Sequence, residues 1–343
     1  MMPPADSLAV SRAPLTLAAI ILLFVTLALT GIAFGSTWIP FAQVWEVLLG
    51  ANIRGKTVII LQFRLPRVVI AALAGGGFAV AGYLLQRVTR NELASPGILG
   101  VVDGAALAVV CFLAALSNES NALVTSVAYQ PVAAVTGSIL AISVVFAFAG
   151  RQAASAIRLL LFGTAVAAVL KSLTVIAMLV GPVYQAGQAA RWIAGAVNEI
   201  NWNEIRITAI GMLPLVFIVL IVARRLPPAD LDEISARSVG LNLPSFRIHI
   251  FVLAAAITAL SAAFVGGVGF IGLMAPHLAR RLMGRTVHFG LLGSFFIGAS
   301  MLVGADLLVR LLFSPTEVPA GTVPAVIGAP YFLYLLMRNQ RHD

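Results

Sequence analysis

PLTLAAIILLFVTLALTGIAFG, residues 14–35, is the stretch that decides the fold, because its 22 residues include no charged side chain. A helix needs about 20 apolar residues to cross the hydrocarbon core of a bilayer. No Ala-x-Ala cleavage pattern follows the stretch. We therefore expect it to be a retained first span and not a cleaved signal peptide.

The composition extends this prediction to the whole chain of 343 residues. Residues of the types AVILMFWYC make up 60% of the chain and charged residues make up 10%, whereas soluble domains have about 45–50% and about 25%. So few charges cannot cover a surface in water, and so many apolar residues exclude intrinsic disorder. We expect residues 1–343 to form a single polytopic transmembrane domain that is all α-helical.

Ten apolar runs, bounded by charges or by clusters of Pro and Gly, are the candidate transmembrane helices. They fall at 14–35, 68–86, 97–116, 123–149, 157–180, 205–223, 247–268, 270–283, 289–313 and 323–337. Eight of them are long enough to span a bilayer. The eighth and the tenth are short and interrupted by Gly and Pro, as is typical of helices that border a transport pathway.

The Arg and Lys residues between these runs predict the orientation. If the N-terminus is cytoplasmic, 14 of the 22 lie in inside segments, 7 lie in outside segments, and Lys171 lies within a span. Inside segments of membrane proteins are enriched in Arg and Lys, so we expect an even number of spans with both termini inside. The basic residues form no stripe with interleaved aromatic residues, and no nucleic-acid partner is expected.

The longest inside connection, residues 224–247, lies between the sixth and the seventh run. Pro227-Pro228 ends the sixth span, and the segment Asp230–Arg237 has acids in its first turn, which is typical of a short helix. Gly240 follows as its stop signal. Two short helices on an otherwise short-looped face indicate a docking platform for a soluble partner. An ordinary solvated loop is the alternative.

Several motifs, in family order and at family spacing, resemble the FecCD permease family over about residues 60–335. They are RLPR at 64–67, RNELASPGILG at 90–100, RLLL at 158–161, RWIAG at 191–195, EISARSVG at 233–240, GFIGLMAPHLARR at 269–281, ADLLVR at 305–310 and IGAP at 327–330. The chain departs from the family pattern at Glu92, where the family commonly has Pro, and at Asp103, where the family has a neutral polar residue. Lys171 is also unusual for the family.

This resemblance implies the membrane subunit of a bacterial ABC importer, with ten transmembrane helices in the type II importer architecture. It implies a place in the bacterial inner (cytoplasmic) membrane and a dimer, formed with an identical or a paralogous permease subunit. Two cytoplasmic ATPase subunits would bind ATP and Mg²⁺, so this chain needs no cofactor of its own. A periplasmic or lipid-anchored binding protein would deliver the substrate, with ferric siderophore expected ahead of haem and cobalamin.

The resemblance also implies the positions of functional residues. Arg64, Arg67 and Arg310 match arginines that pair with acidic residues of the binding protein, and guanidinium groups suit that task; anchoring at the membrane interface is the alternative. Asn91 and Leu93 match the loop that narrows the cytoplasmic exit of the pathway. The segment that couples the permease to its ATPase corresponds to Asp230, Glu233, Ala236, Arg237 and Gly240.

Lys171 lies 13 residues beyond Arg158, which is about 20 Å along a helix and deep in the fifth span. A lysine at that depth needs water or a counter-charge. Because the family's fifth helix lines the translocation path, we expect Lys171 to face that path; a lysine paired inside the bundle is the alternative. Asp103, near the inner end of its run, and Asp306, near the outer end of its own, lie at depths that argue against pairing with Lys171.

The sequence offers little support for other functions. It contains no GxxxxGK[ST] motif, no HExxH motif and no Ser/His/Asp set, so we expect no enzyme and no metal site. The GxGxxG match at 267–272 follows an apolar run and not a strand, and is interpreted as a close-packing hinge. His277 is interpreted as a hydrogen-bonding residue at a helix terminus, with haem ligation as the alternative. The lone Cys111 is interpreted as a small buried residue.

A secondary transporter driven by H⁺ or Na⁺ is the rival class. It would use Asp103, Lys171 and Asp306 as charges within the membrane. The hydropathy pattern shows no two related halves, and such a transporter would leave the platform at 224–247 without a purpose. An ATPase that copurifies with the chain would decide between the two classes.

Overall fold

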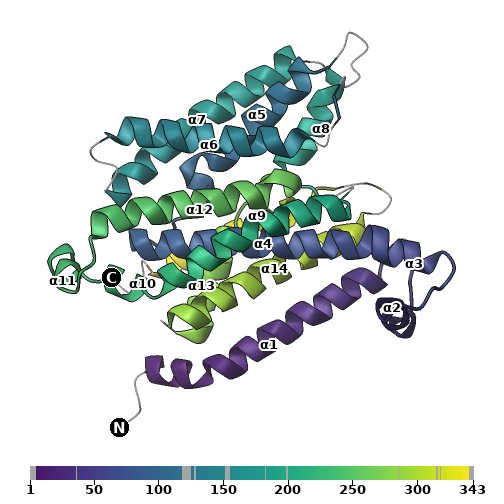
Figure 1. Cartoon of the computed structure of the whole chain (residues 1–343), viewed down its shortest axis with the longest axis horizontal. Coiled ribbons are helices and arrows are strands. Elements are labelled where there is room, and N and C mark those ends of the chain that lie inside the picture. The colour runs from purple at the N-terminus through teal and green to yellow at the C-terminus, as the bar shows by residue number, and fades with distance from the viewer. Residues whose placement is uncertain are drawn as a thin grey trace.

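A computed structural model describes residues 5–35, 37–117, 125–126, 129–150, 155–181, 183–197, 200–284, 286–313, 316 and 318–339. The regular elements in these residues are all helices (Figure 1). In chain order they are α1 (Ala5–Ala33), α2 (Phe41–Leu48), α3 (Lys56–Val58), η1 (Ile59–Arg64), α4 (Leu65–Thr89), η2 (Pro96–Leu99), α5 (Val101–Ala115), α6 (Gln130–Ala149), α7 (Ala156–Val180), α8 (Val183–Ile193), α9 (Trp202–Ala223), α10 (Leu226–Ala229), α11 (Glu233–Ser238), α12 (Leu243–Val265), α13 (Ile271–Met283), α14 (Val287–Leu312) and α15 (Thr322–Asn339).

The ten predicted runs correspond to α1, α4, α5, α6, α7, α9, α12, α13, α14 and α15, and the all-helical membrane fold is confirmed. Seven helices in the described part of the chain are long and apolar enough to cross a bilayer, whereas eight were expected. The expectation was wrong for the run 97–116. Its first residues belong to the 3₁₀ helix η2, and Gly100 turns the chain at φ 72°, which leaves a shorter α5.

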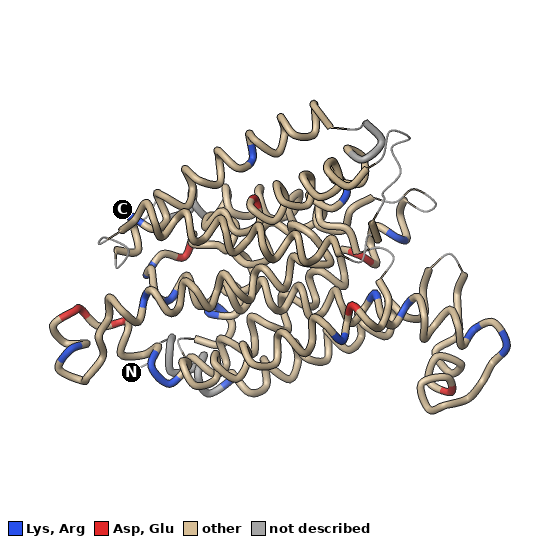
Figure 2. Tube along the Cα trace, turned by 45° about the horizontal axis from the view of Figure 1, so that its top comes forward, with Lys and Arg blue, Asp and Glu red and all other residues tan. Residues whose placement is uncertain are grey.

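The two ends of the bundle differ in what they carry. Figures 1 and 2 place both chain ends beside α10 and α11, while α2 and α3 lie at the opposite end. The predicted orientation, with both termini and residues 224–247 on the cytoplasmic side, requires this arrangement. The end with α10 and α11 is called the cytoplasmic end below, and the opposite end is called the outer end.

α4 is the central helix, and α12, α13 and α14 pack against it, while α5, α6, α7 and α8 form a separate layer (Figure 1). Most of α4 is buried. A methyl group at Gly75 would overlap the carbonyl oxygen of Gly298 on α14, and one at Gly82 would overlap that of Gly272 on α13. Small residues let transmembrane helices approach this closely, so the glycines of α4 set its distance from two neighbours.

The loop at the cytoplasmic end contains the short helix that the sequence predicts. α11 begins at Glu233, three residues later than expected, because the Asp232 carboxylate caps it by accepting the N–H of Ser235 at 3.4 Å. Hydrogen bonding from the side chain of Ser235, and then from its backbone N–H, lowers the pKa of Asp232 from its ordinary value. Gly240, in the left-handed region at φ 82°, lies beyond the end of α11, and α12 begins at Leu243.

Gly82→Ala is expected to destabilise the chain by about 1–3 kcal/mol, because its methyl group would overlap the Gly272 carbonyl and overpacking has a cost of that order. Gly187→Ala on α8 is the matched control, since no atom lies within 4 Å of its added methyl group. Thermal unfolding of the purified chain in detergent measures both variants. Equal melting temperatures would show that α4 and α13 do not touch at this point.

Candidate functional site

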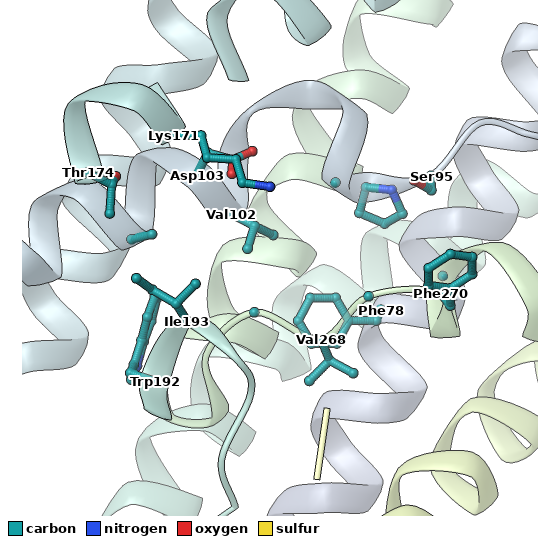
Figure 3. A pocket seen from close by; sticks show the side chains of 16 residues that line it. Phe78, Ser95, Val102, Asp103, Lys171, Thr174, Trp192, Ile193, Val268 and Phe270 are labelled. Atoms are coloured by element: carbon teal, nitrogen blue, oxygen red, sulfur yellow. The ribbon is translucent and has the colours of Figure 1, made fainter. Parts of the chain in front are cut away.

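A cavity of about 270 Å³ lies among α4, α5, α7, α8, η2 and the segment that joins α12 to α13 (Figure 3). Its polar side chains are Ser95, Asp103, Lys171 and Thr174. Its aromatic side chains are Phe78, Trp192 and Phe270. A concave site with a few polar groups among apolar ones is the usual form of a small-molecule site.

Asp103 on α5 and Lys171 on α7 lie on the same side of this cavity (Figure 3), close enough for the lysine charge to act on the carboxylate. The prediction that depth separates them was wrong. η2 and the turn at Gly100 occupy the inner part of the run, so α5 begins farther into the bundle with Asp103 in its first turn. Asp103 therefore lies near Lys171 (Figure 3), and the lysine side chain is also exposed at the surface of the chain.

Irregular backbone borders the cavity where α12 gives way to α13. Gly266 has φ 79°, and a methyl group there would overlap the carbonyl oxygen of Trp192. The Gly267 N–H donates to the same carbonyl at 3.3 Å, and the buried indole Nε1 of Trp192 has no hydrogen-bond partner among the described residues. Backbone of this kind at membrane depth is tolerated where it lines a cavity. The interpretation of residues 267–272 as a close-packing segment agrees with this geometry.

Two of the predicted docking arginines bind within the chain at the outer end. Arg64 is 5% exposed and donates to the carbonyl oxygens of Ile32 at 2.9 Å and Ala33 at 2.7 Å. Arg67 pairs with Asp306 through two nitrogens: Nε lies 2.8 Å from Oδ1 and 3.0 Å from Oδ2, and Nη2 lies 2.7 Å from Oδ1. The side chain of Arg67 remains 24% exposed, whereas that of Asp306 is 4% exposed.

The third of these arginines, Arg310, donates to the carbonyl oxygen of Gly31. Arg67, Arg310 and Asp306 thus join α1, α4 and α14 at the outer end. Asp306 pairs with Arg67. This agrees with the argument from depth against a pair between Asp306 and Lys171. Docking of a binding protein on these arginines stays a prediction, and Arg67 retains more exposure for it than Arg64.

The predicted gate residues lie in the loop between α4 and η2, at the cytoplasmic end. Asn91 is exposed, and its side-chain oxygen accepts the N–H of Leu93 at 2.9 Å. Arg90, just before them, adopts a left-handed conformation at φ 52° that ends α4. The loop continues into Ser95, which lines the cavity. The loop therefore connects the cavity to the cytoplasmic end, and its role as a gate stays a prediction.

The residues predicted to couple to an ATPase differ in their surroundings. Ala236 is fully buried, whereas Glu233 and Arg237 pair with each other on the exposed side of α11 at 3.3 Å. Asp230 pairs with Arg87 at the end of α4, at 2.6 Å. Ile234, which the sequence reasoning did not single out, is 82% exposed. An apolar residue between Glu233 and Ser235, on a helix expected to be exposed, was the sequence signal that could have identified it.

In the described residues, no three His, Cys, Asp or Glu side chains converge to form a candidate metal site. His277 hydrogen-bonds the carboxylate of Glu92 at 3.1 Å and packs beside the rings of Tyr331 and Phe332. The expected hydrogen-bonding role agrees with this contact, but the expected place at a helix terminus was wrong, because His277 lies in the middle of α13. Cys111 is exposed on α5 in the single chain. The expectation that it is buried was therefore wrong.

The helical membrane fold, the charged cavity between helices and the helical loop at one end together define a membrane transport protein. Residues 20–338 match the model of the FecCD transport family, and the chain belongs to this family. The resemblance found in the sequence motifs is thereby confirmed. The chain is accordingly a permease subunit of an ABC importer, because that is the kind of subunit that its relatives form.

Individual relatives cover nearly the same length. The protein named probable siderophore transport system permease protein YfhA, from Bacillus subtilis, is 38% identical over 306 residues, which are 89% of each chain. The achromobactin transport system permease protein CbrC of Dickeya dadantii is 35% identical over 95% of this chain and 91% of its own. A metal-chelate type ABC transporter solved in an inward-facing conformation is 25% identical, with a TM-score of 0.83 over 95% of this chain and 99% of that chain.

Asp306→Asn is expected to lower the stability of the chain by about 2–4 kcal/mol, because it leaves Arg67 without its charged partner, and breaking a buried ion pair has a cost of that order. Glu46→Gln, at an exposed position of α2 near the same end, is the control. Thermal unfolding in detergent measures both variants. If Asp306→Asn melts with the wild type, the outer arginines do not hold α4 and α14 together.

Proposed function

We propose that this chain carries ferric siderophore across a bacterial inner membrane, as the translocation subunit of its ABC importer. The match of residues 20–338 to the family carries this proposal. Relatives named for siderophore and achromobactin transport favour a ferric chelate as the substrate. Haem and cobalamin are the alternatives within the same family.

The cavity favours an anionic chelate. Lys171 lines the cavity and is exposed at the surface of the chain, whereas Asp103 lines the same cavity and is half-buried. A cation in this position attracts carboxylate, catecholate or hydroxamate oxygens that carry negative charge. Lys171 thus faces the translocation path, with Asp103 beside it (Figure 3).

A second permease subunit, identical or paralogous, completes the path along α7. Little of α7 is buried in the single chain, although it is long and apolar. A large unburied apolar face that carries an exposed lysine suits a surface shared with another subunit and with water better than one in lipid alone. Asn91 and Leu93 of the two subunits then close the cytoplasmic exit together.

Residues 224–247 of each permease subunit receive one of the two ATPase subunits, which bind ATP and Mg²⁺. α11 offers an exposed isoleucine beside the exposed pair Glu233–Arg237, and Gly240 lets the chain turn back to α12. Ala236 anchors α11 to the bundle, because it is fully buried. Movement of the ATPase subunits therefore moves the spans as rigid bodies through α11.

A periplasmic or lipid-anchored binding protein delivers the substrate at the outer end. Arg67 supports this step, because its guanidinium has five N–H donors and uses only Nε and Nη2 on Asp306. A carboxylate of the binding protein can join the same guanidinium. Arg64 and Arg310 position α1 beside this contact.

Uptake into proteoliposomes that hold the permease dimer and its ATPase, with the binding protein added, tests the proposal. We expect ATP-dependent import of a ferric siderophore from a panel of catecholate, hydroxamate and hydroxycarboxylate chelates, haem and cobalamin. Import should persist after H⁺ and Na⁺ gradients are collapsed. Import that follows an ion gradient without ATP would support a secondary transporter, and import of haem or cobalamin alone would replace the siderophore.

Lys171→Met is expected to reduce import of an anionic chelate about fivefold, the factor that corresponds to about 1 kcal/mol between two charges in water-like surroundings. Lys171→Arg keeps the charge and should retain most of the import. In a Cys111→Ala background, Lys171→Cys should react with a membrane-impermeant thiol reagent. No labelling in any nucleotide state would place residue 171 inside the bundle and away from the path.

Ile234→Ser is expected to weaken binding of the ATPase subunits about tenfold or more, because an exposed apolar residue that fills a partner's pocket contributes strongly to an interface. Leu49→Ser, which is equally apolar and exposed but lies at the outer end, is the control. Titration of purified ATPase against immobilised permease measures both. Equal affinities for the two variants would mean that α11 does not enter the ATPase.

A further inference from the structure

A second cavity, of about 380 Å³, lies at the cytoplasmic end between the end of α4, the loop after it, α10 and α13. The side chains that line it are Gln86, Arg87, Arg90, Glu92, Asp230 and Arg280. They belong to the residues predicted to form the gate loop, to the loop at 224–247 and to two helices of the core. All are polar, and their contacts form one continuous chain.

The first link joins the coupling loop to α4. Arg87, whose side chain is 8% exposed, pairs with Asp230 at 2.6 Å. Arg90 donates to the backbone carbonyl oxygens of Ala229 at 3.2 Å and of Leu231. A buried guanidinium and two backbone carbonyls hold this loop to the end of α4, so movement of one displaces the other.

The second link joins α4 to α13. Gln86 is 1% exposed, and its side-chain oxygen accepts a hydrogen bond from Arg280 Nη2 at 2.6 Å. Its amide nitrogen donates to the carbonyl oxygen of Leu273 at 3.1 Å. Gln86 and Arg87 are neighbours on the same helix, so the first and second links meet at one turn of α4.

The third link joins α13 to the loop that carries Asn91 and Leu93. Glu92 lies between them, and its carboxylate accepts a hydrogen bond from His277 Nδ1 at 3.1 Å, with Arg280 Nη2 at 3.9 Å. The hydrogen bond from His277 lowers the pKa of Glu92 from its ordinary value, against the effect of burial. Glu92 is therefore charged at neutral pH.

We propose that Glu92 latches the gate loop to α13, and that the contacts Asp230–Arg87 and Gln86–Arg280–Glu92 carry movement of the coupling loop to that latch. This inference rests on the proposed coupling and gate. Glu92 is a positioning residue, since it touches neither ATP nor substrate in this role.

Arg280 lies between the two partners that the relay needs. Its guanidinium is 2.6 Å from the side-chain oxygen of Gln86 and 3.9 Å from the carboxylate of Glu92, so it contacts both. In the proposed relay, a rotation of Arg280 toward Glu92 would exchange the neutral amide for the carboxylate. Coupling between distant sites requires an element with two arrangements that both sites bias, and the proposal assigns that part to Arg280.

Hydrogen exchange of the gate peptide, residues 90–97, measures the latch on the purified permease without substrate or ATPase. Glu92→Gln keeps the shape and removes the charge, and it should raise the exchange of this peptide about two- to fivefold, the range for a partly exposed ion pair. Glu92→Asp should exchange less than Glu92→Gln because it keeps the charge. Glu46→Gln on α2 is the control and should leave the gate peptide unchanged.

The relay is tested with Asp230→Asn and the double variant. If the contacts form one chain, Asp230→Asn alone raises exchange at residues 90–97, and in the Glu92→Gln background it adds nothing. Effects that multiply in the double variant would show independent sites and overturn the relay. Unchanged exchange in Glu92→Gln would overturn the latch.

The reconstituted importer supplies a functional readout that a merely structural role would not change. Glu92→Gln should raise ATP hydrolysis in the absence of substrate about two- to fivefold and lower the substrate imported per ATP, while the binding protein still docks. An unchanged ratio of import to hydrolysis would overturn the latch. A wild type that imports nothing would contradict the proposed function alone, because hydrogen exchange still decides whether Glu92 holds the loop.

Discussion

The burial of α4 is the constraint on which the other sites depend. A helix surrounded by protein can carry polar side chains at depths where lipid would exclude them. Arg67 at its outer end meets Asp306, Phe78 in its middle borders the central cavity, and Gln86 and Arg87 at its cytoplasmic end bind α13 and the loop of α10. The outer ion pair, the central cavity and the cytoplasmic contacts are thus all bordered by the same helix.

Hydropathy predicted the positions of the helices, because an apolar run of about 20 residues has one stable form in a bilayer. It could not separate η2 from α5, since Pro96–Leu99 is as apolar in a 3₁₀ helix as in an α-helix. The error moved Asp103 toward the cytoplasm in the predicted arrangement and concealed its proximity to Lys171. The motif around η2 indicated the family but not the local backbone. Pro96 begins the 3₁₀ helix, and Gly100 ends it in the left-handed region.

Contacts between charges were the part that the sequence could not show. Arg67 and Asp306 are 239 positions apart, and no local periodicity relates them. Glu92 and His277 are 185 positions apart in the sequence, and nothing in the sequence around either residue indicates the other as its partner. Such pairs form only after helices pack, so their identification needs the tertiary arrangement. Composition did indicate that each intramembrane charge required some partner.

The low burial of α7 in the single chain has a consequence for the sequence evolution of this permease. α4 tolerates few replacements because glycines on it touch backbone of α13 and α14, whereas most side chains of α7 touch little else in the chain. Replacements on α7 therefore have a small cost in the folding free energy of the single chain, and under the proposed function they alter the lining of the path. Selection for a new chelate can act on α7 while the rest of the bundle stays as it is.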